Sequence, residues 1–168
     1  NFKNLKHNLE LIRKHTNNLP VMAVVKSNAY GHGIIEVSKY LEKLNIHSLG
    51  VALLEEGIIL RNSGITVPIV VFGGVIEDQV QQLLDWNLEF FISSIDVLKF
   101  TKNICKKNSR EAIVHLKLDS GMGRIGTLLD NAEDFIKEAV FSKNIKIKGV
   151  CSHLACGDDP KNPMTKEQ

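Results

Sequence analysis

The sequence predicts an α/β fold built on parallel strands, and three observations lead to that class. Short apolar runs alternate along the chain with longer segments of helical periodicity. Several of these runs are apolar at consecutive positions, as in strands buried on both faces. The strand-helix unit recurs at intervals of roughly 20–30 residues, which is typical of parallel sheets covered by helices. The predicted strands are residues 21–25, 48–53, 68–72, 88–93, 112–119 and 146–154.

Helical periodicity and capping residues place the helices between these strands. Residues 1–15 form an amphipathic pattern, and later segments repeat it. Gly64 is a candidate C-cap after the second of the helices between strands, and Ser93-Ser94 offers an N-cap for the fourth. The apolar faces are Phe2, Leu5, Leu9 and Ile12; Ile34, Val37, Leu41 and Leu44; Val80, Leu83 and Leu84; and Phe135, Ile136, Ala139 and Val140.

Two architectures fit this alternation: an open doubly wound sheet and a (β/α)8 barrel of the TIM type. A complete barrel needs eight units and about 250 residues. The chain has 168 residues and six predicted strands. The pattern taken alone therefore slightly favours the open sheet.

Composition excludes several classes of protein. The chain is 43% hydrophobic and 24% charged, with a formal net charge of +2. It has no long run of like charge, so neither a nucleic-acid partner nor a membrane partner is expected. It has no apolar stretch of about 20 residues and no apolar core of a secretion signal. Its three cysteines form no pattern of paired zinc ligands, so we expect no metal site and a reduced, cytoplasmic protein.

The first segment with chemical potential is AVVKSNAYGHG, residues 23–33. Lys26 directly follows a predicted strand, at the end where parallel α/β folds place functional loops. A lysine amine can condense with an aldehyde to a Schiff base. The next helix is expected to begin near Gly33, with its first amides facing a phosphate and Tyr30 donating to the same anion. The alternative is a surface lysine followed by glycines that only serve the turn.

Two further segments follow the fifth and sixth predicted strands. HLKLDSGMGRIG, residues 115–126, carries Arg124, whose forked donors suit an anion or a phenolate. Asp119 and Met122 in this segment are expected to have structural roles in the turn. GVCSHLACGDD, residues 149–159, carries His153. A surface arginine and an ordinary strand-end histidine are the alternatives.

Together, these three segments resemble the alanine racemases, and the resemblance runs over essentially the whole chain. Residues 23–33 are similar to that family's pyridoxal-phosphate (PLP) signature, with Ser27 where alanine is common. Residues 117–126 resemble its KxDTGMGRxG element. Residues 149–155 resemble its G-x-x-[ST]-H-[FL]-A element.

The resemblance implies a role for each site residue. Lys26 would hold PLP as a Schiff base and act as the catalytic base on one face of the substrate. Tyr30 would bind the cofactor phosphate, and His153 would lie against the cofactor ring. Arg124 would contact the cofactor's phenolic oxygen and lie near the substrate carboxylate. Lys117 matches a lysine that many members carry as a carbamate, which orients the arginine.

The resemblance also decides the architecture and the domain. The strand ends that precede Lys26, Arg124 and His153 gather around one mouth in a barrel. We therefore expect a (β/α)8 barrel of which residues 1–168 hold about six units, as an incomplete PLP-binding domain. Complete members add two strands and a C-terminal β domain. That domain supplies a second catalytic base, a tyrosine, to the partner subunit of a homodimer.

The predicted function is PLP-dependent interconversion of L-alanine and D-alanine, an isomerase activity that supplies bacterial peptidoglycan with D-alanine. Racemisation requires a base on each face of the carbanion, so we expect residues 1–168 alone to be essentially inactive. The alternatives are a non-enzymatic PLP-homeostasis protein on the same barrel and a sister racemase for another amino acid. A decarboxylase of basic amino acids carries a VKCN-like anchor and fits the Lys26 segment less well.

Overall fold

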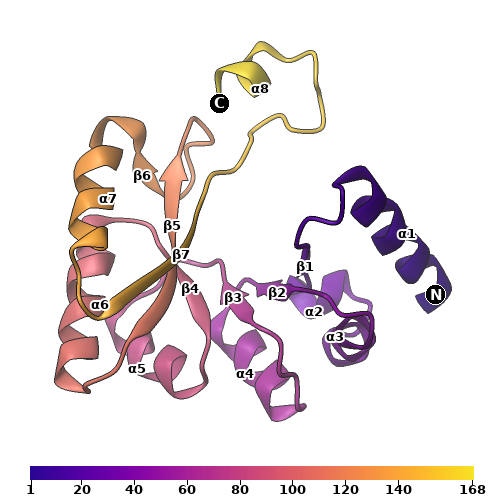
Figure 1. The fold of residues 1–168 in the computed structure, drawn as a ribbon, viewed down its shortest axis with the longest axis horizontal. Helices are drawn as coiled ribbons and strands as arrows, with labels where there is room; N and C mark the ends of the chain where they lie inside the picture. The colour runs from indigo at the N-terminus through magenta and orange to yellow at the C-terminus, as the bar shows by residue number, and fades with distance from the viewer. The chain divides into compact units, whose positions relative to one another are not determined.

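The computed structural model describes residues 1–168 and confirms the predicted α/β class (Figure 1). All strand pairings described below are parallel. The strands are β1 (Met22–Val24), β2 (Ser48–Val51), β3 (Ile69–Val71), β4 (Glu89–Ile92), β5 (Ala112–Asp119), β6 (Thr127–Leu128) and β7 (Ile145–Cys151). The helices are α1 (Phe2–His15), α2 (Lys26–Tyr30), α3 (Ile34–Lys43), α4 (Leu54–Asn62), α5 (Glu77–Asp85), α6 (Ile95–Lys107), α7 (Ala132–Val140) and α8 (Pro163–Glu167), with a 3-10 turn η1 (Leu129–Asn131).

Each of the six predicted strands is present, and the fifth has the predicted bounds. The others differ by one to three residues at an end. The largest difference is at the last strand, which ends at Cys151 because its pairing with β5 ends at Lys117 opposite Cys151. The two-residue strand β6 was not predicted. It pairs with the last two residues of β5.

The chain divides into two compact units, and each is described by itself. The first comprises residues 1–73 and 86–88, and the second residues 74–85 and 89–168. In the first unit, β1 pairs with β2 and β2 with β3. Every residue of β2 and β3 is buried, as expected for strands covered on both faces. Gly50 is required here because a Cβ would lie 2.1 Å from the Phe72 ring.

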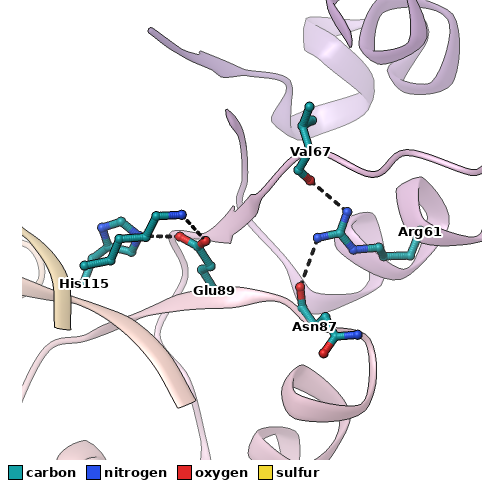
Figure 2. Close-up of polar contacts among 6 residues, drawn as sticks. Arg61, Val67, Asn87, Glu89 and His115 are labelled. Carbon is teal, nitrogen blue, oxygen red and sulfur yellow. Dashed lines mark hydrogen bonds and ion pairs between the residues drawn. The ribbon is translucent and has the colours of Figure 1, made fainter. Parts of the chain in front are cut away.

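Helix α4 is fixed at its C-terminal end by Arg61. The Arg61 guanidinium donates to the carbonyls of Ile65, at 2.9 Å, and Val67, at 2.8 Å. It also donates to the carbonyl of Trp86, at 3.2 Å, and to that of Asn87, at 3.0 Å. Figure 2 shows the contacts of Arg61 with Val67 and Asn87. One side chain thus donates to four loop carbonyls. The planar, forked arrangement of the arginine donors makes this possible.

The helices follow the sequence pattern in part. Of the two serines predicted as the N-cap of α6, Ser94 is the cap and accepts a hydrogen bond from the Val97 amide. Gly64 has a φ of +89° and lies one residue beyond the C-cap Ser63 of α4. The predicted face of α5, Val80, Leu83 and Leu84, is buried. On α7 only Phe135 and Ala139 are buried, and Val140 at the last position is exposed. No helix has both the length and the apolar character that crossing a membrane requires.

In the second unit, β5 pairs with β4 on one side and with β7 on the other. Helices α6 and α7 lie beside these strands (Figure 1). Alternate residues of β5 form an apolar face, since Ala112, Val114 and Leu116 have no exposed surface. The opposite face is polar and carries His115, Lys117 and Asp119, as the two-residue period of a strand requires.

A charged cluster on this unit's polar face links three strands. Glu89 on β4 is buried and accepts from His115 Nε2 at 2.8 Å and from Lys148 Nζ at 2.5 Å (Figure 2). Burial opposes ionisation of Glu89, but the His115 and Lys148 hydrogen bonds outweigh it and lower the carboxyl pKa. No local pattern in the sequence indicates this contact, because Glu89 and His115 lie 26 residues apart.

We expect Glu89→Gln to lower the free energy of unfolding at pH 7 by about 2 kcal/mol, since it removes charged hydrogen bonds from a buried site. The pKa of Glu89 is lower in the folded chain than in the unfolded one, so its stabilisation is present above the unfolded value of about 4.3. It disappears as the pH falls through the folded value. Denaturant titrations from pH 7 to acid should therefore show the two proteins converging. Glu111→Gln, at an exposed position, is the control, and an equal loss there would contradict this account.

Candidate active site

Lys26 lies just beyond β1, separated from its last residue, Val24, by Val25 alone. The Val25 amide donates to the Gly50 carbonyl at 2.8 Å, which extends the β1–β2 pairing to the residue before the lysine. Lys26 is half-buried, and its amine has no hydrogen-bond partner within the chain. The lysine is therefore anchored through its backbone while its amine is available to a ligand.

The backbone after Lys26 forms a left-handed helical turn. Ser27, Asn28, Ala29 and Tyr30 have φ values of 53°, 56°, 53° and 55°. This conformation costs an L-residue roughly 1–2 kcal/mol. Four such residues in succession persist only where surrounding contacts enforce them, and backbone strain of this kind clusters at functional sites.

Asn28 connects this turn to helix α3. Its carbonyl accepts from the Gly33 amide at 3.0 Å, and its side-chain Oδ1 accepts from the Ile34 amide at 2.9 Å. The sequence placed the first amides of this helix against a phosphate. In the chain itself the Ile34 amide already has an acceptor, because the left-handed turn brings Asn28 Oδ1 to the start of the helix. The phosphate contact of the first amides stays a prediction.

Tyr30 ends the left-handed turn four residues after Lys26. Its side chain is 61% exposed, and its hydroxyl has no partner within the chain. A phenol in this position can donate a hydrogen bond to an anionic ligand.

In the second unit, the loop after β5 is organised by Asp119. Its carboxylate accepts from the amides of Gly121 at 2.9 Å, Gly123 at 3.0 Å and Arg124 at 3.0 Å. These hydrogen bonds lower the pKa of the Asp119 carboxyl, and the bond from the Gly123 amide has the largest effect. The predicted structural role of Asp119 is confirmed. The Arg124 backbone is thereby fixed, while its guanidinium is exposed and has no partner within the chain.

Lys117 lies two residues before Asp119 and is buried. Its Nζ donates to the Leu118 carbonyl at 3.1 Å. Its partner on β7 is Cys151. Burial raises the pKa of the Cys151 thiol, and the Lys117 charge offsets only part of that rise. The carbamate on Lys117 stays a prediction.

The Arg124 and His153 segments are in contact within the second unit. The Ser120 and Ser152 hydroxyls lie 2.5 Å apart, so the residue after β5 touches the residue after β7. His153 follows directly and is exposed, with no partner for its ring within the chain. Gln168 adds a second link, because its Nε2 donates to the His153 carbonyl at 3.3 Å and to Ser120 Oγ at 3.4 Å.

The structure thus joins two of the three predicted segments and places the Lys26 segment in the other unit. Lys26 and Tyr30 lie on one turn in the first unit, and Lys117, Arg124 and His153 lie at neighbouring strand ends in the second. Sequence reasoning missed Glu56, which contacts the turn after Lys26. An acidic residue in the first turn of a helix is a recognised capping signal, but it does not reveal a second contact 29 residues away.

The model of the family described as "Alanine racemase, N-terminal domain" matches residues 1–168. This chain belongs to the alanine racemase family. An alanine racemase of Geobacter sulfurreducens is 36% identical over 156 residues, which are 92% of this chain and 41% of that protein. One of Methanococcus maripaludis is 36% identical over 166 residues, 98% of this chain and 44% of that protein. The chain therefore spans less than half the length of these relatives.

Solved alanine racemase structures have the same fold. The Clostridium difficile 630 enzyme superposes with a TM-score of 0.90 at 31% identity, covering 98% of this chain and 44% of that one. The Streptomyces lavendulae enzyme gives 0.92 at 27% identity, with 99% and 44% covered. These likenesses confirm the predicted fold, part of an α/β barrel of the alanine racemase type. A histidine racemase of Leuconostoc mesenteroides, at 24% identity and a TM-score of 0.91, shares the fold alone.

Proposed function

We propose that the chain is the PLP-binding portion of a racemase that interconverts L-alanine and D-alanine. The observation that carries this proposal is Lys26, a half-buried lysine with an unpartnered amine at the end of β1, followed by a strained left-handed turn. Membership of the alanine racemase family supports the reaction class.

The side chains present fit PLP in chemistry. Lys26 offers an amine for a covalent link to the aldehyde, and Tyr30 offers a phenol for the phosphate. Arg124 offers a permanent positive charge for the phenolic oxygen and the substrate carboxylate. His153 would lie against the ring, and Lys117, as a carbamate, would orient Arg124. PLP, when bound, supplies an electron sink for the negative charge that forms on the α-carbon.

In this proposal Lys26 moves the α-proton on one face of the substrate. Inversion of the α-carbon needs a second base on the opposite face. We place that base, a tyrosine, in the β domain of a partner subunit in a homodimer. The relatives extend well beyond the matched region, which leaves room for such a domain. We further propose that the protein is cytoplasmic and that its product, D-alanine, is used in peptidoglycan.

The decisive experiment assays L-alanine and D-alanine interconversion with added PLP. It uses the 168-residue chain and, in parallel, the longest protein that its reading frame encodes. We expect turnover by the longer protein and essentially none by residues 1–168 alone. PLP binding without turnover in the longer protein would favour a homeostasis role. Faster turnover of serine or histidine than of alanine would favour a sister racemase.

A further inference from the structure

Glu56 occupies the third position of helix α4 and uses both oxygens of its carboxylate. Oε2 accepts from the amides of Ala52 at 2.8 Å and Leu53 at 3.2 Å, the residues that connect β2 to α4. Oε1 accepts from the Ser27 amide at 2.5 Å. A glutamate at this position commonly caps its own helix. The contact with Ser27 goes beyond capping, because it joins the end of β2 to the end of β1.

Ser27 is the residue directly after Lys26 and the first of the left-handed turn. Its amide donates only to Glu56, since no other acceptor is found for it within the chain. Without that acceptor, the turn would lose the one side-chain contact that holds its first residue. The strain of four left-handed residues, roughly 1–2 kcal/mol each, would then favour relaxation of the backbone that carries Lys26.

The geometry requires a carboxylate and not merely a side chain of this size. Both terminal atoms of Glu56 face backbone N–H donors, so both must be acceptors. A glutamine has one oxygen and one NH2 group. It could satisfy either Ser27 or the Ala52–Leu53 pair, and its NH2 group would then face the other donor.

We propose that Glu56 is a positioning residue for Lys26: its carboxylate fixes the left-handed turn and thereby the direction of the lysine. The inference rests on the proposed function only as regards the ligand that Lys26 binds. The Glu56 contacts with Ser27, Ala52 and Leu53, here called the clamp, are present in the chain without any ligand.

The test compares Glu56→Gln with Glu55→Gln, an exposed neighbour in the same helical turn whose side chain makes no hydrogen bond. The first measurement is hydrogen exchange of the Ser27 amide, resolved by NMR in the chain without cofactor. We expect exchange to be at least about tenfold faster in Glu56→Gln and unchanged in Glu55→Gln. Amides of the buried strand β5 report whether each variant remains folded.

The second measurement is covalent capture of PLP, trapped with borohydride and located by peptide mass. We expect the rate of capture at Lys26 to fall about tenfold in Glu56→Gln. Unchanged Ser27 exchange would overturn the clamp, and faster exchange with unchanged capture would overturn the positioning role. If wild type captures no PLP, the proposed function fails while the exchange data still decide the clamp. Should Glu56→Gln not fold, Glu56→Asp, whose shorter side chain cannot span both contacts, replaces it in the same measurements.

Discussion

Replacing Lys26 by alanine is expected to abolish covalent capture of PLP and to lower alanine racemisation by about a thousandfold or more. The amine is the proposed point of attachment and the proposed base, so both roles are lost at once. A single positioned acid–base group contributes about 10²–10⁴-fold in rate. Borohydride trapping followed by peptide mass measures the first effect, and racemisation by the longest encoded protein measures the second.

Lys39→Ala is the matched control for this prediction. Lys39 is an exposed lysine on α3, close in sequence and free of hydrogen bonds. It should capture PLP and turn over alanine as wild type does. Trapped PLP located on any lysine other than Lys26, or racemisation that survives Lys26→Ala, would contradict the assignment of Lys26.

The second large effect is expected for Gly126→Ala, between the Asp119-organised loop and β6. Gly126 has a φ of +132°, and a Cβ there would lie 2.7 Å from both the Asp119 nitrogen and the Leu118 carbonyl carbon. Backbone atoms cannot yield as a flexible side chain can. We expect a loss of about 3 kcal/mol or more in the free energy of unfolding, from overpacking added to backbone strain. Denaturant unfolding monitored by circular dichroism measures it.

Gly123→Ala, in the same loop, separates strain from collision. Gly123 also has a positive φ, +70°, but a Cβ there meets no atom within 4 Å. Only the cost of the left-handed conformation remains, about 1 kcal/mol. Equal losses for the two variants would show that the close approach of Gly126 to β5 is not important for stability.

Much of the fold could be predicted because the residues that the apolar periodicity of the sequence marks as buried are largely those that the structure buries. Strand β5 has the predicted bounds, and the face of α5 is buried as predicted, because period and length both specified them. Strand β6 could not be predicted, since two residues carry no periodicity and its pairing depends on the close approach of Gly126 to β5. The Glu89–His115 pair could not be predicted for another reason, which is that the two residues are 26 positions apart on different strands.

The candidate site was predictable in its residues but not in its backbone. Lys26, Tyr30, Arg124 and His153 were selected by their place after strands and by resemblance. A turn was expected from the glycines that follow Lys26 in residues 23–33. The structure also forces Ser27, Ala29 and Tyr30 into the left-handed region, for which none of them has a preference. Contacts distant in sequence, such as Glu56 with Ser27, impose that conformation, so no local rule could reveal it. The approach of Lys26 to Arg124 and His153 stays a prediction.

In the left-handed turn, the usual effect of a glycine on helix stability is reversed. In an ordinary helix a glycine weakens the element, because it gains freedom when the chain unfolds. At residues 27–30 the side chains themselves carry the conformational cost, and removing a Cβ would relieve it. At Asn28 and Ala29 the side chains also serve the fold, because Asn28 accepts from the Ile34 amide and Ala29 is buried. Ser27 and Tyr30 are exposed, so glycine would be thermodynamically favoured there. A side chain retained at either of these two positions would indicate a demand on what it binds rather than on stability.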